Sequence, residues 1–244
     1  MKQLRFFATI SVAAAALFIS SCNSDEGKKA GDKMADSTAV KTETPAPAPM
    51  PSGPMMVMTI KHKVTNYAKW KPFYDGHDSI RQANGLHNYV IARGTQDSNM
   101  LLIALKMDDV EKAKAMTASK EMKERMQKAG VTGPTTFDYL ESVMNDTTNI
   151  MQTERVMVTS KVKDWDAWKK SFDSHKQVRL DSGLIDRVIA HTVGDNHLVT
   201  LVFAITDIKK AKAFMNSKDL KDRMAEAGVV GPPTFFYYKI VATY

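Results

Sequence analysis

Apolar and polar positions follow the same order in two stretches of the chain, residues 57–143 and residues 155–241. The two stretches align without a gap at an offset of 98, and 32 of the 87 aligned positions are identical. Internal similarity of this length indicates two copies of one structural unit. Each copy has the length of a small domain, so we expect both repeats to adopt the same fold.

The periodicity of the apolar residues predicts strand, helix, strand, strand, helix and strand in each repeat. In repeat one, Asn66 and Asp109 stand where the two helices begin, as N-caps, and Ser119 is placed to restart the second helix. Gly85 and Gly130 follow the two helices and end them. The elements predicted in repeat one are strands at 56–64, 86–93, 100–107 and 135–143 and helices at 67–84 and 109–129.

The β-α-β-β-α-β order is that of a ferredoxin-like unit, which carries both helices on one face of an antiparallel sheet. The opposite face of each sheet also needs a cover, and a second sheet can provide it. We therefore expect an α+β protein in which two tandem ferredoxin-like units, at 55–144 and 155–244, form a pseudo-dimer within one chain. A polar connector at 145–154 separates the two units. A homodimer of such chains stays open as an alternative.

The first predicted helix of each repeat carries two aromatic residues, a histidine and an arginine at positions i, i+4, i+7 and i+11. On an α-helix this spacing places the four side chains on one face, within roughly 60° of arc. Aromatic rings, an imidazole and a guanidinium on one face outline a candidate ligand pocket. Its residues are Trp70, Tyr74, His77 and Arg81 in repeat one and Trp168, Phe172, His175 and Arg179 in repeat two.

Two interpretations of the histidine and arginine pairs remain open. In a functional pocket, the imidazole would act as an acid, a base or a hydrogen-bond donor, and the guanidinium would bind an anionic or enolate-like oxygen. In a structural network, the histidine would bond a backbone carbonyl and the arginine would pair with a carboxylate such as Asp75 or Asp173. The aromatic residues likewise fit a pocket wall or an ordinary core. The sequence therefore assigns no catalytic residue.

The N-terminal segment has the order of a secretory signal over residues 1–21: Lys2 and Arg5, an apolar run, and small residues at the end. The four residues that end at Cys22 resemble the lipobox of bacterial lipoproteins, which implies cleavage before Cys22 and lipidation of this residue. The following stretch, up to residue 54, is rich in proline and poor in large apolar residues, which predicts a disordered linker.

Four polar residues directly after Cys22, Asn23-Ser24-Asp25-Glu26, resemble the acidic export signals of some outer-membrane lipoproteins. We therefore expect a lipid-anchored protein of the bacterial cell envelope, in the outer membrane and on its periplasmic or surface face.

The composition argues against several kinds of chemistry and several partners. Cys22 is the only cysteine, so a lipidated protein has neither a disulfide nor a thiol nucleophile. The formal net charge is +7, or +5 without Lys2 and Arg5, and no basic tract points to nucleic acid. No two histidines have the i, i+4 spacing of a helical metal site, so we expect no bound metal. The histidines that occur in one repeat only are His62, His87, His191 and His197.

Repeat one contains two longer motifs, Asn66-Tyr67-x-x-Trp70 with Tyr74-Asp75-x-His77-x-x-x-Arg81-x-x-x-Gly85, and Ser119-Lys120-x-x-Lys123-x-Arg125-Met126-x-x-Ala129-Gly130-Val131-x-Gly133-Pro134. These motifs resemble those of the antibiotic-biosynthesis-monooxygenase-like (ABM-like) proteins, a family of dimeric α/β barrels. The resemblance covers both repeats and implies an α/β barrel. It also implies a class that holds cofactor-free oxygenases, isomerases, haem-degrading enzymes and non-enzymes.

The haem-degrading members use a histidine on the second helix as the axial ligand, and neither second helix here contains a histidine. We therefore expect no cofactor. The sequence favours a module that binds a small anionic or aromatic ligand, or a non-catalytic module. The alternative is a cofactor-independent monooxygenase or isomerase that uses the histidine and arginine pairs.

Overall fold

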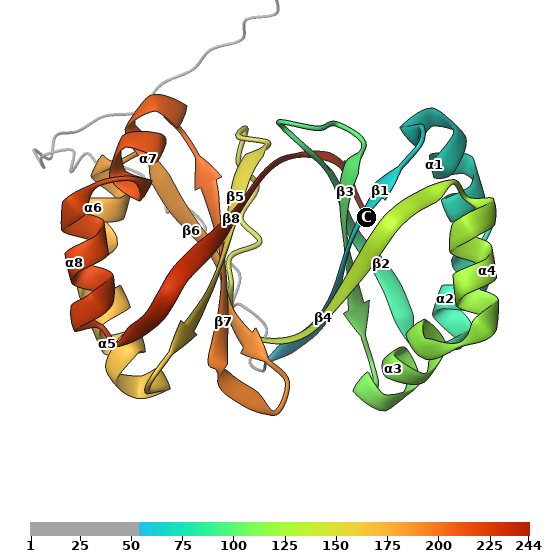
Figure 1. Ribbon diagram of the computed structural model, residues 1–244, viewed down its shortest axis with the longest axis horizontal. Helices are drawn as coiled ribbons and strands as arrows, with labels where there is room; N and C mark the ends of the chain where they lie inside the picture. Colours follow the sequence, from blue (N-terminus) through green and yellow to red (C-terminus); the bar gives the residue numbers. More distant parts are fainter. Residues whose placement is uncertain (1–53) are drawn as a thin grey trace, which may run out of the picture. The chain divides into compact units, whose positions relative to one another are not determined.

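Eight antiparallel strands close into one barrel in the computed structural model, which describes residues 54–244 (Figure 1). The predicted signal segment, Cys22 and the linker as far as residue 53 lie outside the described residues. The strands are β1 (Met55–Val64), β2 (Leu86–Gly94), β3 (Met100–Met107), β4 (Val131–Asn145), β5 (Glu154–Val162), β6 (Leu184–Thr192), β7 (Asp195–Ile205) and β8 (Val229–Thr243).

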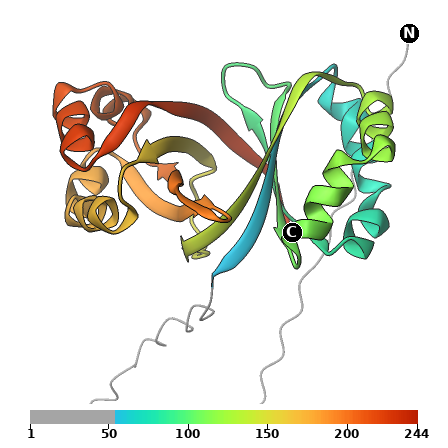
Figure 2. The same cartoon turned by 60° about the horizontal axis from the view of Figure 1, so that its bottom comes forward.

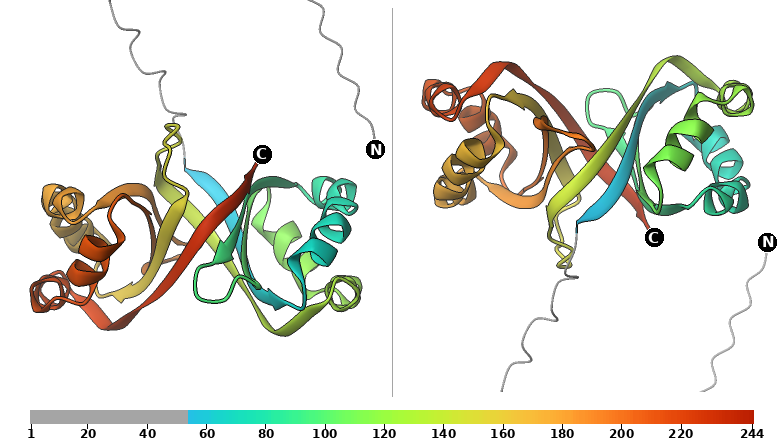
Figure 3. Two further views of the ribbon diagram at one scale, coloured as in Figure 1. Left: turned by 90° about the horizontal axis from the view of Figure 1, so that it is seen from above. Right: turned by 90° about the horizontal axis from the view of Figure 1, so that it is seen from below.

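Each repeat contributes four neighbouring strands to the barrel. The order around it is β1-β3-β2-β8-β5-β7-β6-β4, and β4 returns to β1. The two halves therefore meet at two seams, where β2 pairs with β8 and β4 pairs with β6. Both seams can be followed in the two views of Figure 3.

The helices cover the outside of the barrel, α1 to α4 over the first half and α5 to α8 over the second (Figures 1 and 2). They are α1 (Tyr67–Asp75), α2 (Asp78–Ala83), α3 (Val110–Ala118), α4 (Lys120–Lys128), α5 (Trp165–Ser174), α6 (Lys176–Asp181), α7 (Ile208–Met215) and α8 (Lys218–Glu226). None of the helices in residues 54–244 is long and apolar enough to cross a membrane.

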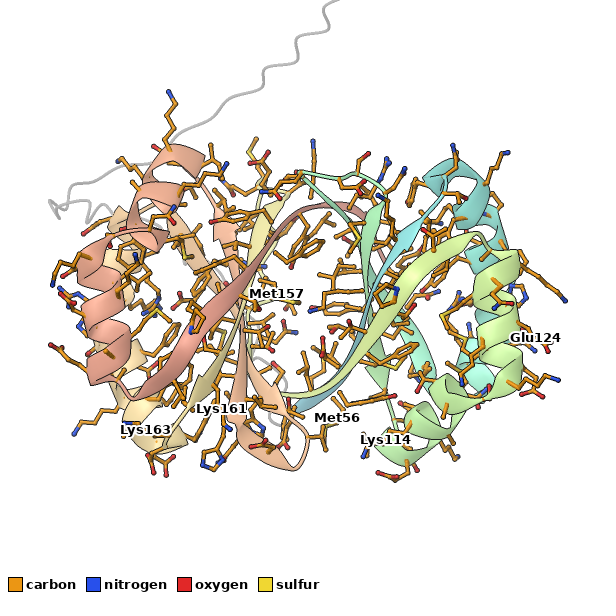
Figure 4. The ribbon with its side chains drawn as sticks, viewed as in Figure 1. Met56, Lys114, Glu124, Met157, Lys161 and Lys163 are labelled. Carbon is orange, nitrogen blue, oxygen red and sulfur yellow. The ribbon has the colours of Figure 1, made fainter. Side chains whose placement is uncertain are left out.

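Strand alternation explains why the fold has three cores. In β1, Met58 and Ile60 face the helices of repeat one, and the matched Val156 and Val158 in β5 face the helices of repeat two. Residues of the other parity point into the barrel. Figure 4 shows Met157 on this inner side. The barrel core consists of Ala92, Leu102, Met157, Val202 and Tyr238.

Three of the predicted N-caps are confirmed in repeat one. Oδ1 of Asn66 accepts a hydrogen bond from the backbone N–H of Lys69 (3.0 Å), and Asp109 accepts two from the first turn of α3. Ser119 divides the second predicted helix into α3 and α4, and its hydroxyl accepts from the N–H of Met122 (3.1 Å).

The predicted start of the last strand, Thr135, was wrong. The strand β4 begins at Val131, because Gly133 and Pro134 form a bulge within it rather than a loop before it. Lys61 pairs with Thr136 while Lys63 pairs with Thr132, so three residues of β4 face one of β1. Gly133 takes φ +70°, which favours glycine, and proline lacks the N–H that a regular ladder would need.

Candidate functional site

The predicted single helix 67–84 was also wrong, because it is two helices that break at His77. In an unbroken helix the N–H of His77 would bond the carbonyl of Phe73. Instead it bonds the carbonyl of Tyr74 (3.2 Å), and Nδ1 of the His77 ring bonds the carbonyl of Phe73 (2.7 Å). The side chain thus replaces the backbone donor and ends α1.

Repeat two has the same break. Nδ1 of His175 lies 2.8 Å from the carbonyl oxygen of Ser171, and the N–H of His175 bonds the carbonyl of Phe172 (3.2 Å). A carbonyl oxygen only accepts, so Nδ1 carries the hydrogen and Nε2 of the neutral ring is an acceptor. Both histidines therefore bond a backbone carbonyl, as the structural interpretation expected.

The aromatic and arginine side chains remain on one face despite the break. Trp70 and Tyr74 stack with ring centroids 4.8 Å apart, and the guanidinium of Arg81 lies 3.7 Å from the centroid of Tyr74. In repeat two, Trp168 and Phe172 stack at 5.2 Å, and Arg179 lies 3.6 Å from the Phe172 centroid. All eight residues of the predicted pocket therefore come together as two matched stacks, each with its histidine alongside.

Both arginines pair with a carboxylate, as the structural interpretation expected, but Asp75 and Asp173, its two examples, are not the partners. Asp75 binds Lys71 on the exposed side of α1, and Asp173 binds Lys169 in the same way, each at 2.6 Å. Both aspartates lie four residues after a lysine, so a surface pair satisfies them.

In repeat one, Arg81 enters a network of side chains from α1, α2 and β2. It donates to Oδ1 of Asp78 (3.1 Å), to Oδ1 of Asn88 (3.1 Å) and to the carbonyl of Tyr74 (2.7 Å). The Tyr74 hydroxyl also donates to Oδ1 of Asn88 (2.6 Å). Burial raises the pKa of Tyr74, so its hydroxyl keeps its proton at neutral pH.

In repeat two, Arg179 pairs directly with Asp186 of β6. Nε and one terminal nitrogen each bind one carboxylate oxygen, at 2.8 and 2.6 Å. Both side chains are at least nine-tenths buried. A two-pronged pair of this kind fixes the guanidinium plane, so Arg179 is held by the protein and not left for a ligand.

Each repeat has a cavity between its helices and its half of the barrel. The cavity is about 80 Å³ in repeat one and about 90 Å³ in repeat two. All eight residues of the predicted pocket line these two cavities. The other walls are mainly apolar, with Ile103, Leu105, Met122 and Met126 in repeat one and Leu201, Phe203, Phe214 and Met224 in repeat two.

The cavities suit a small, mostly apolar molecule. An engineered apolar cavity of about 150 Å³ holds benzene, so these spaces accept a ring only if wall side chains move. Met122, Met126 and Met224 are the flexible side chains best suited to such movement. Each cavity wall contains a second arginine besides Arg81 or Arg179. Arg223 pairs with Asp219 (2.8 Å), while Arg125 has no ion pair with the described residues.

His62 is a wall residue that the sequence reasoning missed, because it was considered only as a metal ligand. It lies on β1, is 4% exposed, and lines the cavity of repeat one. Burial lowers the pKa of His62 to about 4, so its ring is neutral at pH 7. Strand alternation could have found it, since residue 62 has the parity of Met58 and Ile60. Within residues 54–244, no three His, Cys, Asp or Glu side chains are grouped to hold a metal ion.

Neither a protein-family profile nor a curated protein matches the sequence. Solved structures do match the fold. An anthrone oxidase-like protein superposes with a TM-score of 0.54 at 15% identity, over 78% of this chain and 92% of that one. A candidate monooxygenase from Fusobacterium nucleatum subsp. nucleatum gives 0.51 at 12% identity, over 79% and 94%. At these identities the likeness shows a shared α+β fold and no activity.

Proposed function

We propose that each repeat binds a small, mainly apolar molecule in the cavity between its helices and the barrel. The observation that carries this proposal is the pair of matched cavities, each walled by an aromatic stack and a histidine. A structural core gains stability by filling such spaces, so their presence at the same place in both repeats favours a ligand. An aromatic ligand fits better than an anionic one, because Arg81, Arg179 and Arg223 already have carboxylate partners and Arg125 is only half-buried.

Counting bound toluene molecules by calorimetry or NMR tests this proposal. We expect two molecules per chain. Ala129 and Ala227 line the two cavities, so Ala129→Leu and Ala227→Leu should each reduce the number to one. The exposed Ala115, changed to Leu, is the control and should leave two. Absence of binding, or binding that neither cavity variant reduces, would contradict the proposal.

A second candidate is cofactor-independent oxygenation or isomerisation. The observation that favours it is the acceptor Nε2 of His77 and His175 beside a cavity, where it is suited to take a proton from a bound substrate. Anthrone is the first substrate to test, given the fold likeness to an anthrone oxidase-like protein, and its three rings require a wider opening of the cavity than a single ring does. Anthrone-dependent uptake of dioxygen that His77→Gln and His175→Gln abolish would support catalysis. Uptake at the rate of the buffer would exclude it for this substrate.

We further propose that the protein is anchored by lipid at Cys22 in the outer membrane, and that its barrel is a pseudo-dimer of two ferredoxin-like units. The lipobox-like sequence supports the anchor, and the strand order within each half supports the units. Cys22→Ser should move the protein from the membrane fraction to the soluble fraction. Unchanged membrane association would contradict a lipid anchor at Cys22.

A further inference from the structure

The imidazole of His62 is buried without a hydrogen bond. Neither Nδ1 nor Nε2 has a partner among residues 54–244, although the side chain belongs to the cavity wall of repeat one. Buried polar groups in native proteins almost always have partners, so an orphaned imidazole needs an explanation.

The neighbouring ring of Trp70 does not supply the missing hydrogen bonds. Trp70 meets His62 edge to face with centroids 6.0 Å apart. A neutral imidazole has one N–H donor and one bare acceptor nitrogen. The face of the indole ring can take a weak N–H contact at most, so the acceptor nitrogen stays without a donor.

The fold itself does not require a histidine at this place. The matched residue of repeat two is Ser160, which is also buried and lines the matched cavity. Two copies of one fold therefore tolerate different polar side chains here. Because an unpaired imidazole weakens the folded state, its presence in one copy points to a role in binding.

We propose that His62 is the hydrogen-bonding group of the repeat-one cavity, and that the ligand is a small, neutral aromatic molecule with one hydroxyl group. A turn of the imidazole about χ2 presents a nitrogen to the hydroxyl, while the ring of the ligand lies against Trp70 and Ile103. The cavity of repeat two, with Ser160, has a different preference. This inference rests on the proposed ligand-binding function of the cavities.

Paired titrations with p-cresol and toluene, which differ by one hydroxyl group, test the inference. They are made on the full chain carrying Ala227→Leu, which leaves the repeat-one cavity as the binding site, and are followed by the NMR signals of the histidine rings. We expect p-cresol to bind about tenfold more tightly than toluene and to shift the His62 signals, because it supplies the missing hydrogen bond.

Two variants at His62 give the decisive comparison. His62→Leu keeps the bulk and should reduce the p-cresol preference to about onefold, since the imidazole that bonds the hydroxyl is gone. His62→Ser introduces the residue that repeat two has at the matched position, so it controls for an effect of leucine packing. It should also lower the preference for p-cresol over toluene. The exposed His87, changed to Leu, should leave the preference unchanged.

The outcomes separate the two proposals. If toluene and p-cresol bind equally well to the chain with His62, or if the preference survives in His62→Leu, the inference about His62 fails while ligand binding stands. If neither probe binds, both proposals fail.

Discussion

Arg81 and Arg179 occupy matching positions, yet different elements supply their carboxylates. Repeat one uses Asp78 on α2, with Asn88 of β2 beside it. Repeat two uses Asp186, which aligns with Asn88, and has Lys176 where Asp78 would be. The negative charge has moved from the helix to the strand. A buried guanidinium needs a partner, and the two repeats satisfy that need in two ways.

The two arginines should differ in their contribution to stability. Arg179→Met leaves Asp186 buried and unpaired, so we expect a loss of about 3–5 kcal/mol in the free energy of unfolding. Arg81→Met should cost less, because the carboxylate of Asp78 is 37% exposed and returns to water. Urea denaturation of both variants measures the difference. Equal losses would show that the two networks bury their charge to the same extent.

His62 should make stability depend on pH. Its pKa is lowered from 6.5 to about 4 in the folded protein, so as pH falls below 6.5 the unfolded chain takes up a proton that the folded protein refuses. Protonation of His62 therefore has no effect on stability above pH 6.5, and it lowers the free energy of unfolding by about 3 kcal/mol as the pH falls to 4. His62→Leu should lack this loss and should be more stable at pH 7 by about 1–3 kcal/mol. Parallel curves of unfolding free energy against pH for the two proteins would contradict the buried, unpaired state of His62.

At the scale of the residue, the sequence predicted which side chains lie together, but it did not predict which carboxylates pair with the arginines. Periodicity placed the two aromatic stacks with their arginines, because a shared helix face needs only spacing. The choice of Asp75 failed because neighbours along the chain compete for each carboxylate, and Lys71 is the nearer partner. The aligned repeats show the aspartate at different positions. Asp78 of repeat one aligns with Lys176, and Asn88 of repeat one aligns with Asp186. This comparison would have identified Asp78 and Asp186 as the partners of the two arginines.

At the scale of the element, the break between α1 and α2 is made by a side chain. His77 follows Gly76, but His175 follows Ser174, so glycine is not the common cause. The common feature is a ring Nδ1–H that takes the carbonyl of residue i−4. The sequence could not show this break, because the apolar periodicity continues across it and Arg81 still reaches the ring of Tyr74.

Leucine at these positions should test the cap. His77→Leu and His175→Leu each remove one half-buried hydrogen bond, so we expect each to lower the free energy of unfolding by about 0.5–1.5 kcal/mol. The double variant should lose the sum, because the two histidines lie in separate repeats and share no partner. Thermal melts of the three variants provide the measurement. A gain in stability in either single variant would mean that the histidine is held for a ligand rather than for the helix.

At the scale of the whole molecule, the sequence predicted the strands and the duplication but not the seams. Apolar runs identify strands one at a time, and the resemblance to ABM-like proteins implied a barrel. The pairing of β2 with β8 and of β4 with β6 depends on edges far apart in the sequence, such as Gly94 with Tyr238. No local pattern in a single sequence carries that information.

Two separately expressed pieces, residues 54–149 and 150–244, should reassemble. Each piece alone exposes two strand edges and the apolar inner face of its half, so it should aggregate or self-associate. Together they should form a soluble 1:1 complex in which both seams are restored. Size-exclusion chromatography with light scattering reads the composition. If both pieces are stable monomers and do not associate when mixed, the seams are not needed for folding.

The fusion of the two halves in one chain also has an evolutionary consequence. In a symmetric homodimer every substitution appears twice, so both sites change together and neither can specialise. Here one codon changes one repeat only, and the aligned repeats differ in this way at His62 and Ser160 and at Asn88 and Asp186. A gene that encodes both halves thus gains the versatility of a heterodimer, with fixed stoichiometry and without the need to sort partners.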